Sequence, residues 1–298
     1  MQEQSETHSA PGSTPGWLQG TDAGYGTNED FSSSSADVHP STSGFLQHAQ
    51  SISIIISLLL SPVAIILVIL WTSSLGGVSW AQGEAQKVFN WHPVLMVTAF
   101  AIMNGGALVF RASGTSSYQS SLQSSPTMPA ASPDSKKRGI VKLSHGIFWA
   151  LTFIFGIVAM LAVFKSHNDP ISGYIANLYS LHSWVGILVL SLYTLQFMVG
   201  ILAFGGLVRS RMSNSTMIEI HKFTGIYIHI LATATILMGI QEKEGFVSCS
   251  YAVESPDLMP LLNYGKIPHA CKISHGLGLV ILMMGLCTSI GLARFPAS

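Results

Sequence analysis

Charged side chains are scarce in this sequence. Only 9% of its 298 residues are Asp, Glu, Lys or Arg, whereas about 25% is usual in a soluble protein. The 14 basic residues equal the 14 acidic residues in number and are scattered over short segments, so no cationic face is available to bind phosphate backbones. This composition excludes an ordinary cytosolic enzyme and a nucleic-acid-binding protein.

Cysteine is rare as well. The three cysteines include no C-x-x-C pair, which excludes a disulfide scaffold, a zinc ribbon and an iron–sulfur site. Any metal chemistry must therefore use the 11 histidines.

Long apolar runs, by contrast, are abundant. A helix needs about 20 apolar residues to cross the hydrocarbon core of a bilayer, and a β-barrel would instead show short alternating strands. We therefore predict an all-α protein in the lipid bilayer with six transmembrane helices. The predicted spans are residues 52–71, 91–110, 143–164, 181–204, 221–240 and 273–293.

Two segments outside the spans are rich in Ser and Pro. Residues 1–50 contain six acidic residues and no Lys or Arg, and we predict that they form a disordered tail because they cannot bury enough apolar surface to offset the entropy of ordering. Residues 112–135 are predicted to form a flexible loop with a basic rim at residues 136–138. The rest, residues 51–294, is one six-helix membrane domain.

The distribution of Lys and Arg indicates the orientation in the membrane. With a cytosolic N-terminus, nine of the 14 basic residues lie in cytosolic segments and five on the other side. The positive-inside rule therefore predicts that both termini, including the tail of residues 1–50, are cytosolic.

Histidine recurs in the spans, which contain no Asp, Glu or Arg. An imidazole in hydrocarbon is costly, and it is either functional or bonded to a neighbouring hydroxyl. Because consecutive spans alternate in direction, His92 and His182 both begin spans at the outer end, and His145 and His221 both begin spans at the cytosolic end. The sequence thus predicts two level pairs separated by most of the membrane.

Two imidazoles without a carboxylate or thiolate make a poor site for zinc, calcium or manganese. They do supply the two axial nitrogens of a six-coordinate haem iron, which favours electron transfer over oxygen activation. Two pairs therefore predict two haems stacked across the bilayer. His229 competes with His221 as a ligand, but it is level with no other ring and we interpret it as packed or hydrogen-bonded. His275 is interpreted as an interfacial histidine at the outer end.

Six stretches of the sequence resemble the cytochrome b561 family of ascorbate-dependent transmembrane oxidoreductases. They occur in order over most of residues 50–293, in register with the spans: residues 89–96 (FNWHPVLM), 142–146 (KLSHG), 164–168 (FKSHN), 176–184 (ANLYSLHSW), 220–225 (IHKFTG) and 238–243 (MGIQEK).

The resemblance implies an enzyme with two haems b in a core of spans two to five. The outer haem is bound by His92 and His182, and the cytosolic haem by His145 and His221. Cytosolic ascorbate is then the donor, and monodehydroascorbate or ferric iron in a chelate is the acceptor on the other side. The resemblance also implies that the protein is a homodimer. We expect the protein in the plasma membrane or in an endosomal, lysosomal or vesicle membrane.

Residues around the two substrates are implied in the same way. An ascorbate anion needs cations at its binding site, and the matching cytosolic residues are Arg111, Arg138 and Lys142, although the positive-inside rule alone also explains them. The residues that match the outer acceptor site are His167, Asn168, Phe100 and Phe246. His167 has the alternative interpretation of a solvated loop residue.

Cys249 and Cys271 lie in the long segment between spans five and six, which the predicted topology places on the non-cytosolic side. Oxidation can occur there, so the two residues either form a disulfide that closes this segment or stay as free thiols.

Two functions from other classes compete with this interpretation. One is a haem-bearing anchor subunit that passes electrons to quinone or to a partner, against which His167 argues. The other is a haem-free, histidine-lined metal transporter, against which the absence of carboxylates in the spans argues.

Overall fold

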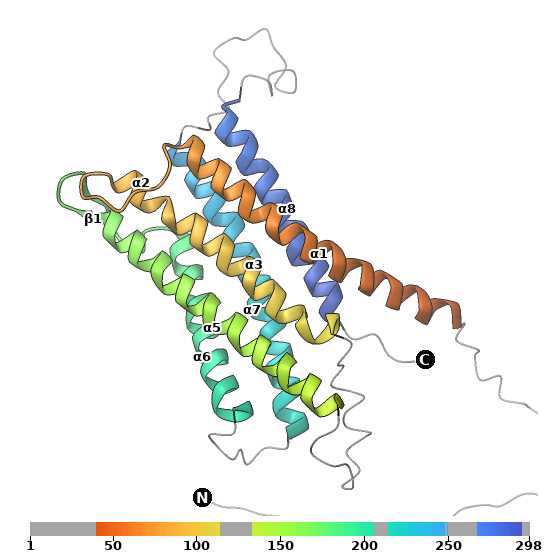
Figure 1. Cartoon of the computed structure of the whole chain (residues 1–298). Helices are drawn as coiled ribbons and strands as arrows, with labels where there is room; N and C mark the ends of the chain where they lie inside the picture. Colours follow the sequence, from red (N-terminus) through yellow and green to blue (C-terminus); the bar gives the residue numbers. More distant parts are fainter. Residues whose placement is uncertain (1–39, 114–132, 206–213, 248, 250–266, 294–298) are drawn as a thin grey trace, which may run out of the picture. The chain divides into compact units, whose positions relative to one another are not determined.

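The structure is a computed structural model that describes residues 40–113, 133–205, 214–247, 249 and 267–293. Within these residues, six helices are long and apolar enough to cross a membrane, which confirms the six predicted spans. Figure 1 shows them running lengthwise beside one another. The elements are α1 (Pro40–Ser74), α2 (Ala85–Phe89), α3 (Trp91–Ala112), α5 (Pro133–His167), β1 (Asn168–Asp169), β2 (Gly173–Tyr174), α6 (Leu181–Phe204), α7 (Asn214–Phe246) and α8 (His269–Leu292).

Several helices are longer than the apolar runs that predicted them. The first helix begins at Pro40, so the predicted boundary of the tail at residue 50 is wrong, and residues 1–39 lie outside the described residues. The predicted loop 112–135 is also too wide, because α3 includes Ala112 and α5 already begins at Pro133. Residues 114–132 lie outside the described residues. Polar helix ends carry backbone hydrogen bonds as well as apolar turns do, but a hydropathy window does not register them.

The helices pack mainly as antiparallel neighbours: α3 lies against α5, α6 against α7, and α1 against α8. Buried polar side chains connect α1, α3 and α8. The Ser57 hydroxyl donates to Asn104 Oδ1 at 3.1 Å and lies 2.7 Å from the hydroxyl of Thr288, which also donates to Asn104. Hydrogen bonds between helices in an apolar medium fix the register of the packing.

One end of the bundle is closed by short elements. The β1–β2 hairpin follows α5, and α2 lies beside it (Figure 1). The Asp169 carboxylate joins the two segments, because it accepts hydrogen bonds from the Gly83 N–H at 2.7 Å and from the Ser172 hydroxyl at 2.9 Å. A disulfide between Cys249 and Cys271, with a Cα–Cα distance of 5.9 Å, joins α8 to the chain after α7 at the same end. We call this the disulfide end, and the other the opposite end.

Candidate haem centres

Four helices bring the predicted histidines together as two pairs. His92 is the second residue of α3 and His182 the second residue of α6, and their ring centroids are 6.1 Å apart at the disulfide end. His145 of α5 and His221 of α7 are likewise 6.1 Å apart at the opposite end. A metal–nitrogen bond is about 2 Å long, so two imidazoles on opposite sides of one iron place their ring centres about 6 Å apart. Both pairs have the separation that axial haem ligands require.

In three of the four rings Nδ1 faces a backbone carbonyl of a neighbouring helix. His92 Nδ1 lies 3.3 Å from the Ala159 carbonyl, and His145 Nδ1 lies 2.7 Å from that of Gly106. His182 Nδ1 lies 2.9 Å from the Thr235 carbonyl. An Nδ1–H that donates to a carbonyl fixes the tautomer in which Nε2 carries the lone pair, as is usual for metal-binding histidines.

The four contacts follow one spacing. Each helix carries a paired histidine and, 14 positions later, the residue that contacts the Nδ1 of a histidine at the other end. These positions are His92 and Gly106 on α3, His145 and Ala159 on α5, His182 and Gln196 on α6, and His221 and Thr235 on α7. Fourteen residues rise about 21 Å and return to nearly the same helix face. Each antiparallel helix pair thus holds one ring at each end.

His221 is the exception in how it is held. The amide nitrogen of Gln196 lies 2.9 Å from His221 Nδ1 and 2.7 Å from the His221 carbonyl oxygen. This ring therefore faces a side-chain amide where the other three face a carbonyl. Gln196 is buried, so the contact is shielded from water.

A glycine provides the space beside one ring. A Cβ atom on Gly239 of α7 would lie 2.7 Å from Cε1 of His182, a contact that real side chains do not make. Only glycine lets α7 approach the ring this closely. Two imidazoles per site, with no carboxylate in the pair, match the needs of a haem iron, whose other four ligands come from the porphyrin. The residues present fit a haem at each pair.

A cavity of about 120 Å³ adjoins the His92/His182 pair. His167, at the end of α5, lines it and is buried, so it is not a solvated loop residue. Its ring stacks on Phe89 with 6.1 Å between centroids, and its Nδ1 lies 3.2 Å from the Asn177 amide oxygen. The ammonium group of Lys243 lies 4.6 Å from the centre of the Phe89 ring. Lys243 also lines the cavity and is only 5% exposed.

Of the three other residues predicted for the outer site, the structure places one in the lining of the cavity. Phe246 lines the cavity. Asn168 does not, because its exposed side chain turns back and donates to the Phe164 carbonyl at 2.7 Å. Phe100 does not line the cavity either. It lies eight residues after His92, about 12 Å deeper along α3, where it stacks on His229 with 4.9 Å between ring centroids.

Several residues that line this cavity were not among those predicted for the outer site, among them Phe89, Asn177, Tyr179 and Lys243. All four lie within stretches that resemble the family, which was the available signal. Burial raises the pKa of the Tyr179 phenol, and its hydrogen bond to Glu242 and the charge of that carboxylate raise it further. Tyr179 is therefore a neutral hydrogen-bond donor at physiological pH.

The predicted cations lie at the opposite end. Arg111 is in the last turn of α3 and donates to the Ala293 carbonyl at 3.0 Å. Arg138 and Lys142 are exposed and four residues apart on α5, hence on one face, and His145 follows Lys142 by three residues. Arg138 and Lys142 therefore lie on the part of α5 that leads to His145.

Aromatic and apolar side chains fill the space between the two levels. Trp149 stacks on Tyr193 with 5.0 Å between centroids, and the Tyr193 hydroxyl donates to the Trp149 carbonyl at 2.5 Å. His229 is packed, as expected, and is only 2% exposed. Neither of its ring nitrogens has a hydrogen-bond partner among the described residues, so its hydrogen-bonded alternative is not found.

Comparisons with known proteins place the chain in a family. The sequence model of eukaryotic cytochrome b561 matches residues 131–247. Transmembrane ascorbate ferrireductase 1 of Arabidopsis thaliana is 34% identical over 189 residues, which are 63% of this chain and 70% of that protein.

Two animal relatives match over a longer part of the chain. Plasma membrane ascorbate-dependent reductase CYBRD1 of Xenopus laevis is 31% identical over 230 residues, 77% of this chain and 70% of the relative. Lysosomal membrane ascorbate-dependent ferrireductase CYB561A3 of Danio rerio is 30% identical over 237 residues, 79% and 84% of the two chains. With its histidine pairs on four membrane helices, the chain is a haem-b-binding oxidoreductase of the cytochrome b561 family.

Proposed function

We propose that this protein carries electrons across a membrane, from cytosolic ascorbate through two bis-histidine haems b to monodehydroascorbate or a ferric chelate on the other side. The observation that carries the proposal is the two histidine pairs, each with 6.1 Å between ring centroids. The 14-residue spacing separates their levels by about 21 Å, most of the hydrocarbon core. The relatives named as ascorbate-dependent reductases and ferrireductases support the donor and the ferric acceptor.

Two independent features support the orientation. Disulfides persist in oxidising compartments, so Cys249–Cys271 favours a non-cytosolic disulfide end. The basic residues Arg111, Arg138 and Lys142 lie at the opposite end, which the positive-inside rule assigns to the cytosol. The two termini are then cytosolic, the His145/His221 haem is near the donor, and the His92/His182 haem is near the acceptor.

Ascorbate is an anion at neutral pH and requires compensating charge where it binds. Arg138 and Lys142 supply two exposed cations on the face of α5 that leads to His145, and Arg111 ends the neighbouring helix. These residues attract the donor and orient it toward the cytosolic haem. Phe110 and Phe204 pack against the two ligands, with ring centroids 5.4 Å from His145 and 5.2 Å from His221.

The acceptor binds in the cavity at the disulfide end. Lys243 places a buried ammonium group in the wall of this cavity, whose lining also includes the Glu242 carboxylate, and this ammonium group can pair with an anionic acceptor such as monodehydroascorbate or a ferric chelate. His167 is oriented by Asn177, so one ring nitrogen is fixed and the other is available to the acceptor. Phe246 covers the cavity at its edge and is half exposed.

When bound, the haems supply one-electron redox chemistry at a saturated iron. The chain holds three of the four histidine rings through Nδ1 contacts with backbone carbonyls and the fourth, His221, beside the Gln196 amide, and it packs aromatic side chains between the two levels. We further expect a homodimer in the plasma membrane or in an endosomal, lysosomal or vesicle membrane, since the relatives include plasma-membrane and lysosomal proteins.

The haem assignment is tested with His92→Ala and His145→Ala. Each substitution removes one axial nitrogen, so we expect the wild-type protein to contain two haems and each variant to contain one. His92→Ala should keep the haem that ascorbate reduces directly, and His145→Ala should lose it. Haem content per chain and visible spectra before and after ascorbate measure both effects. Two haems in both variants would contradict the pairing.

The transmembrane reaction is tested in sealed vesicles loaded with ascorbate. We expect reduction of an impermeant ferric chelate outside the vesicles, and its loss in the His92→Ala variant. A protein that is reduced by ascorbate but passes no electrons to the outer chelate would instead be an anchor subunit for a partner or for quinone. A purified protein without haem absorption would favour the alternative of a haem-free, histidine-lined metal transporter.

A further inference from the structure

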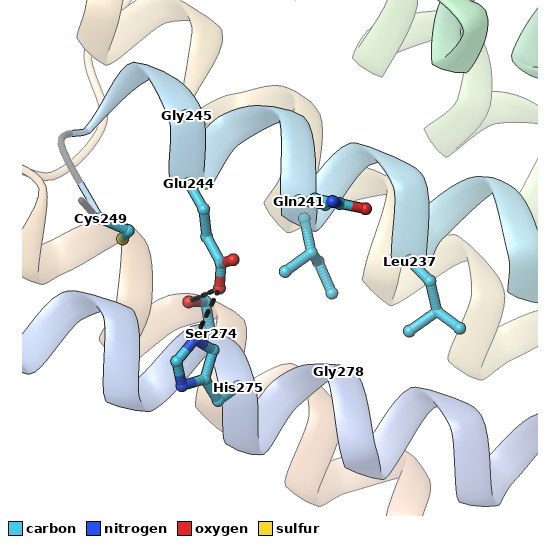
Figure 2. A pocket seen from close by; sticks show the side chains of 9 residues that line it. Leu237, Gln241, Glu244, Gly245, Cys249, Ser274, His275 and Gly278 are labelled. Carbon is cyan, nitrogen blue, oxygen red and sulfur yellow. Dashed lines mark hydrogen bonds and ion pairs between the residues drawn. The ribbon is translucent and has the colours of Figure 1, made fainter. Parts of the chain in front are cut away.

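Several charged side chains at the disulfide end have partners within the protein. The Lys87 ammonium group lies 2.7 Å from the Glu84 carboxylate. Glu244 lines a cavity of about 470 Å³ between α7 and α8. Figure 2 shows Glu244 reaching toward Ser274 and His275, and its Oε1 lies 3.6 Å from His275 Nε2. These charges are therefore compensated by neighbouring side chains.

The start of α5, at the opposite end, carries a cluster of exposed basic side chains. They are Lys136, Lys137, Arg138 and Lys142. Neither Lys136 nor Lys137 takes part in an ion pair among the residues that the structure describes. Their positive charges are therefore available to a partner outside the chain.

The helical period places these basic residues on two sides of α5. Successive residues of an α-helix are rotated by about 100°, so residues three, four, seven and eleven positions apart share a face. The face that carries His145 packs into the bundle, since Val141 and Trp149 are each 6% exposed. Arg138 precedes His145 by seven residues and Lys142 precedes it by three. These two cations therefore lie on the bundle side of the helix.

Lys136 lies on the other side of α5. The residues four and seven positions after it are Ile140 and Leu143, which are 66% and 65% exposed. A Cβ atom on Gly139 or Gly146, on the same face, would meet no neighbouring atom within 4 Å. Nothing in the described part of the chain covers this face, and its exposed aliphatic side chains identify it as the face that contacts lipid.

The position of Lys136 along α5 brings it to the membrane surface. The two histidine levels are about 21 Å apart in a hydrocarbon core about 30 Å thick, so each level lies about 4–5 Å inside the core when the two are centred in it. Lys136 precedes His145 by nine residues, which is about 13–14 Å of helix, so its Cα lies about 9 Å outside the core. The headgroup region extends about 5–8 Å beyond the core. Lys136 is therefore level with the outer surface of the headgroups.

The lipids of the cytosolic leaflet carry the complementary charge. Anionic phospholipids give this leaflet a negative surface potential that attracts basic residues next to a membrane helix. A lysine places a compact charge on a flexible stem, so its ammonium group can reach a headgroup phosphate. The surface around Lys136 is also continuous with the lipid-facing surface of α5, which begins at Ile140. Charge and position thus both favour a phospholipid headgroup as the partner.

We propose that Lys136 and Lys137 bind the headgroups of anionic phospholipids in the cytosolic leaflet. Lys137 is exposed and adjoins Lys136 at the edge of the lipid-facing side. Arg138 and Lys142, on the bundle side, remain available to ascorbate as proposed above. The two pairs of cations on one helix thus bind different anions. The assignment to the cytosolic leaflet rests on the orientation proposed above, whereas lipid binding itself rests on α5 alone.

The test is a titration of the full-length haem protein, in a neutral detergent, with dioleoyl phosphatidylserine and in parallel with dioleoyl phosphatidylcholine. Native mass spectrometry counts the lipids bound per chain. We expect the wild-type protein to bind phosphatidylserine more tightly than phosphatidylcholine. A Lys136→Gln/Lys137→Gln variant should bind phosphatidylserine about 25-fold more weakly, since each basic residue near an anionic surface is worth roughly five-fold. It should keep both haems and its rate of reduction by ascorbate.

A matched control removes the same number of charges from the other side of the same helix. An Arg138→Gln/Lys142→Gln variant should keep its preference for phosphatidylserine and be reduced more slowly by ascorbate, and haem absorption reports that each variant is folded. Equal loss of phosphatidylserine binding in the two variants would show attraction by net charge alone and overturn the proposal. Equal affinity of the wild type for the two lipids would overturn it too, as would slower reduction by ascorbate in the Lys136→Gln/Lys137→Gln variant.

Discussion

The Nδ1 atom of each of the four paired histidines contacts a neighbouring helix. For three rings the contact is a backbone carbonyl, and for His221 it is the Gln196 amide. A carbonyl is unaffected by substitution of its own side chain, whereas the Gln196 contact can be removed by a single change. The His145/His221 pair, where we propose the cytosolic haem, is therefore the one whose Nδ1 contact can be altered by a single substitution.

Gln196→Leu should weaken haem binding at the His145/His221 pair alone. The leucine fills similar volume but makes no contact with His221 Nδ1 or with the His221 carbonyl. Loss of such a partner typically costs about 10- to 100-fold in metal affinity. Haem content per chain and the spectrum of the haem reduced directly by ascorbate measure the effect. The control Gln82→Leu changes an exposed glutamine, and equal loss of both haems in Gln196→Leu would show a general defect in folding.

The pairing of the histidines could be predicted from the sequence, whereas the contacts that hold their rings could not. The partners of His92 and His145 followed from helix direction, because a polar ring in the first turn of a span reveals the end at which it lies. The Nδ1 contacts could not be predicted, since carbonyls of Ala159, Gly106 and Thr235 have no signature in the sequence. Phe100 was assigned to the wrong depth because a resemblance gives the position along a helix but not the face it presents.

At the scale of elements, close approach of helices depends on small residues at defined positions. The Cβ of an alanine at Gly239 would meet the His182 ring at 2.7 Å, and the ring is confined by its contact with the Thr235 carbonyl. Gly239→Ala should therefore displace His182 and remove the haem of the His92/His182 pair, leaving one haem per chain. Haem content measures the loss.

A second glycine of the same end provides the control for this prediction. A Cβ on Gly276 of α8 would have no atom within 4 Å. Gly276→Ala should keep both haems and raise helix stability by about 0.5–1 kcal/mol. If both alanine variants lose haem equally, the effect comes from the helices in general rather than from contact with His182.

The connection between α2 and the β-hairpin should depend on pH through Asp169. Burial acts to raise the pKa of this carboxyl, but hydrogen bonds from the Ile171 N–H, the Ser172 hydroxyl and the Gly83 N–H outweigh it and keep the pKa below its ordinary value. A lowered pKa means that ionised Asp169 stabilises the fold above the pKa of the unfolded state, about 3.9. This contribution is lost as the pH falls through the pKa of the folded protein.

Asp169→Asn should accordingly lower the melting temperature at neutral pH, and the difference from wild type should shrink below about pH 4. Thermal unfolding followed by circular dichroism, from roughly pH 3 to roughly pH 7, measures the two curves. Asp134→Asn, at the opposite end of α5, tests whether loss of a carboxylate alone has this effect. A difference from wild type that stays constant with pH would contradict the role of the ionised carboxylate.

Element boundaries were the least predictable part of the fold. The six spans were correct as apolar segments, yet α1 and α5 begin at Pro40 and Pro133, about ten residues before the runs that revealed them. Once a helix has formed in the membrane, each added residue continues its backbone hydrogen bonds into the polar region. The helices therefore extend beyond their apolar residues. The hairpin after α5 could not be predicted, since two-residue strands leave no alternating pattern.

Over the whole bundle, the two ends differ in chemistry in a way that supports the orientation proposed above. The disulfide end carries the Cys249–Cys271 bond and the cavity with Lys243, and the opposite end carries Arg138 and Lys142. An electron carrier with two similar haem centres needs this asymmetry, because the helix pairs alone do not distinguish donor from acceptor. The direction of transfer then follows from where each substrate is present.

This asymmetry predicts which side of the membrane each end of the bundle faces. In sealed vesicles with the non-cytosolic face outward, a Tyr174→Cys variant, with the new thiol at a position of the β-hairpin that is 74% exposed, should be labelled by an impermeant maleimide without permeabilisation. Cys249, Cys271 and Cys287 are all buried and should stay unlabelled. A Lys136→Cys variant, with the new thiol on the exposed start of α5, should be labelled only after the vesicles are permeabilised. Labelling in the reverse order would place Arg138 and Lys142 on the non-cytosolic face, and ascorbate in the cytosol could not then reach the haem that these cations adjoin.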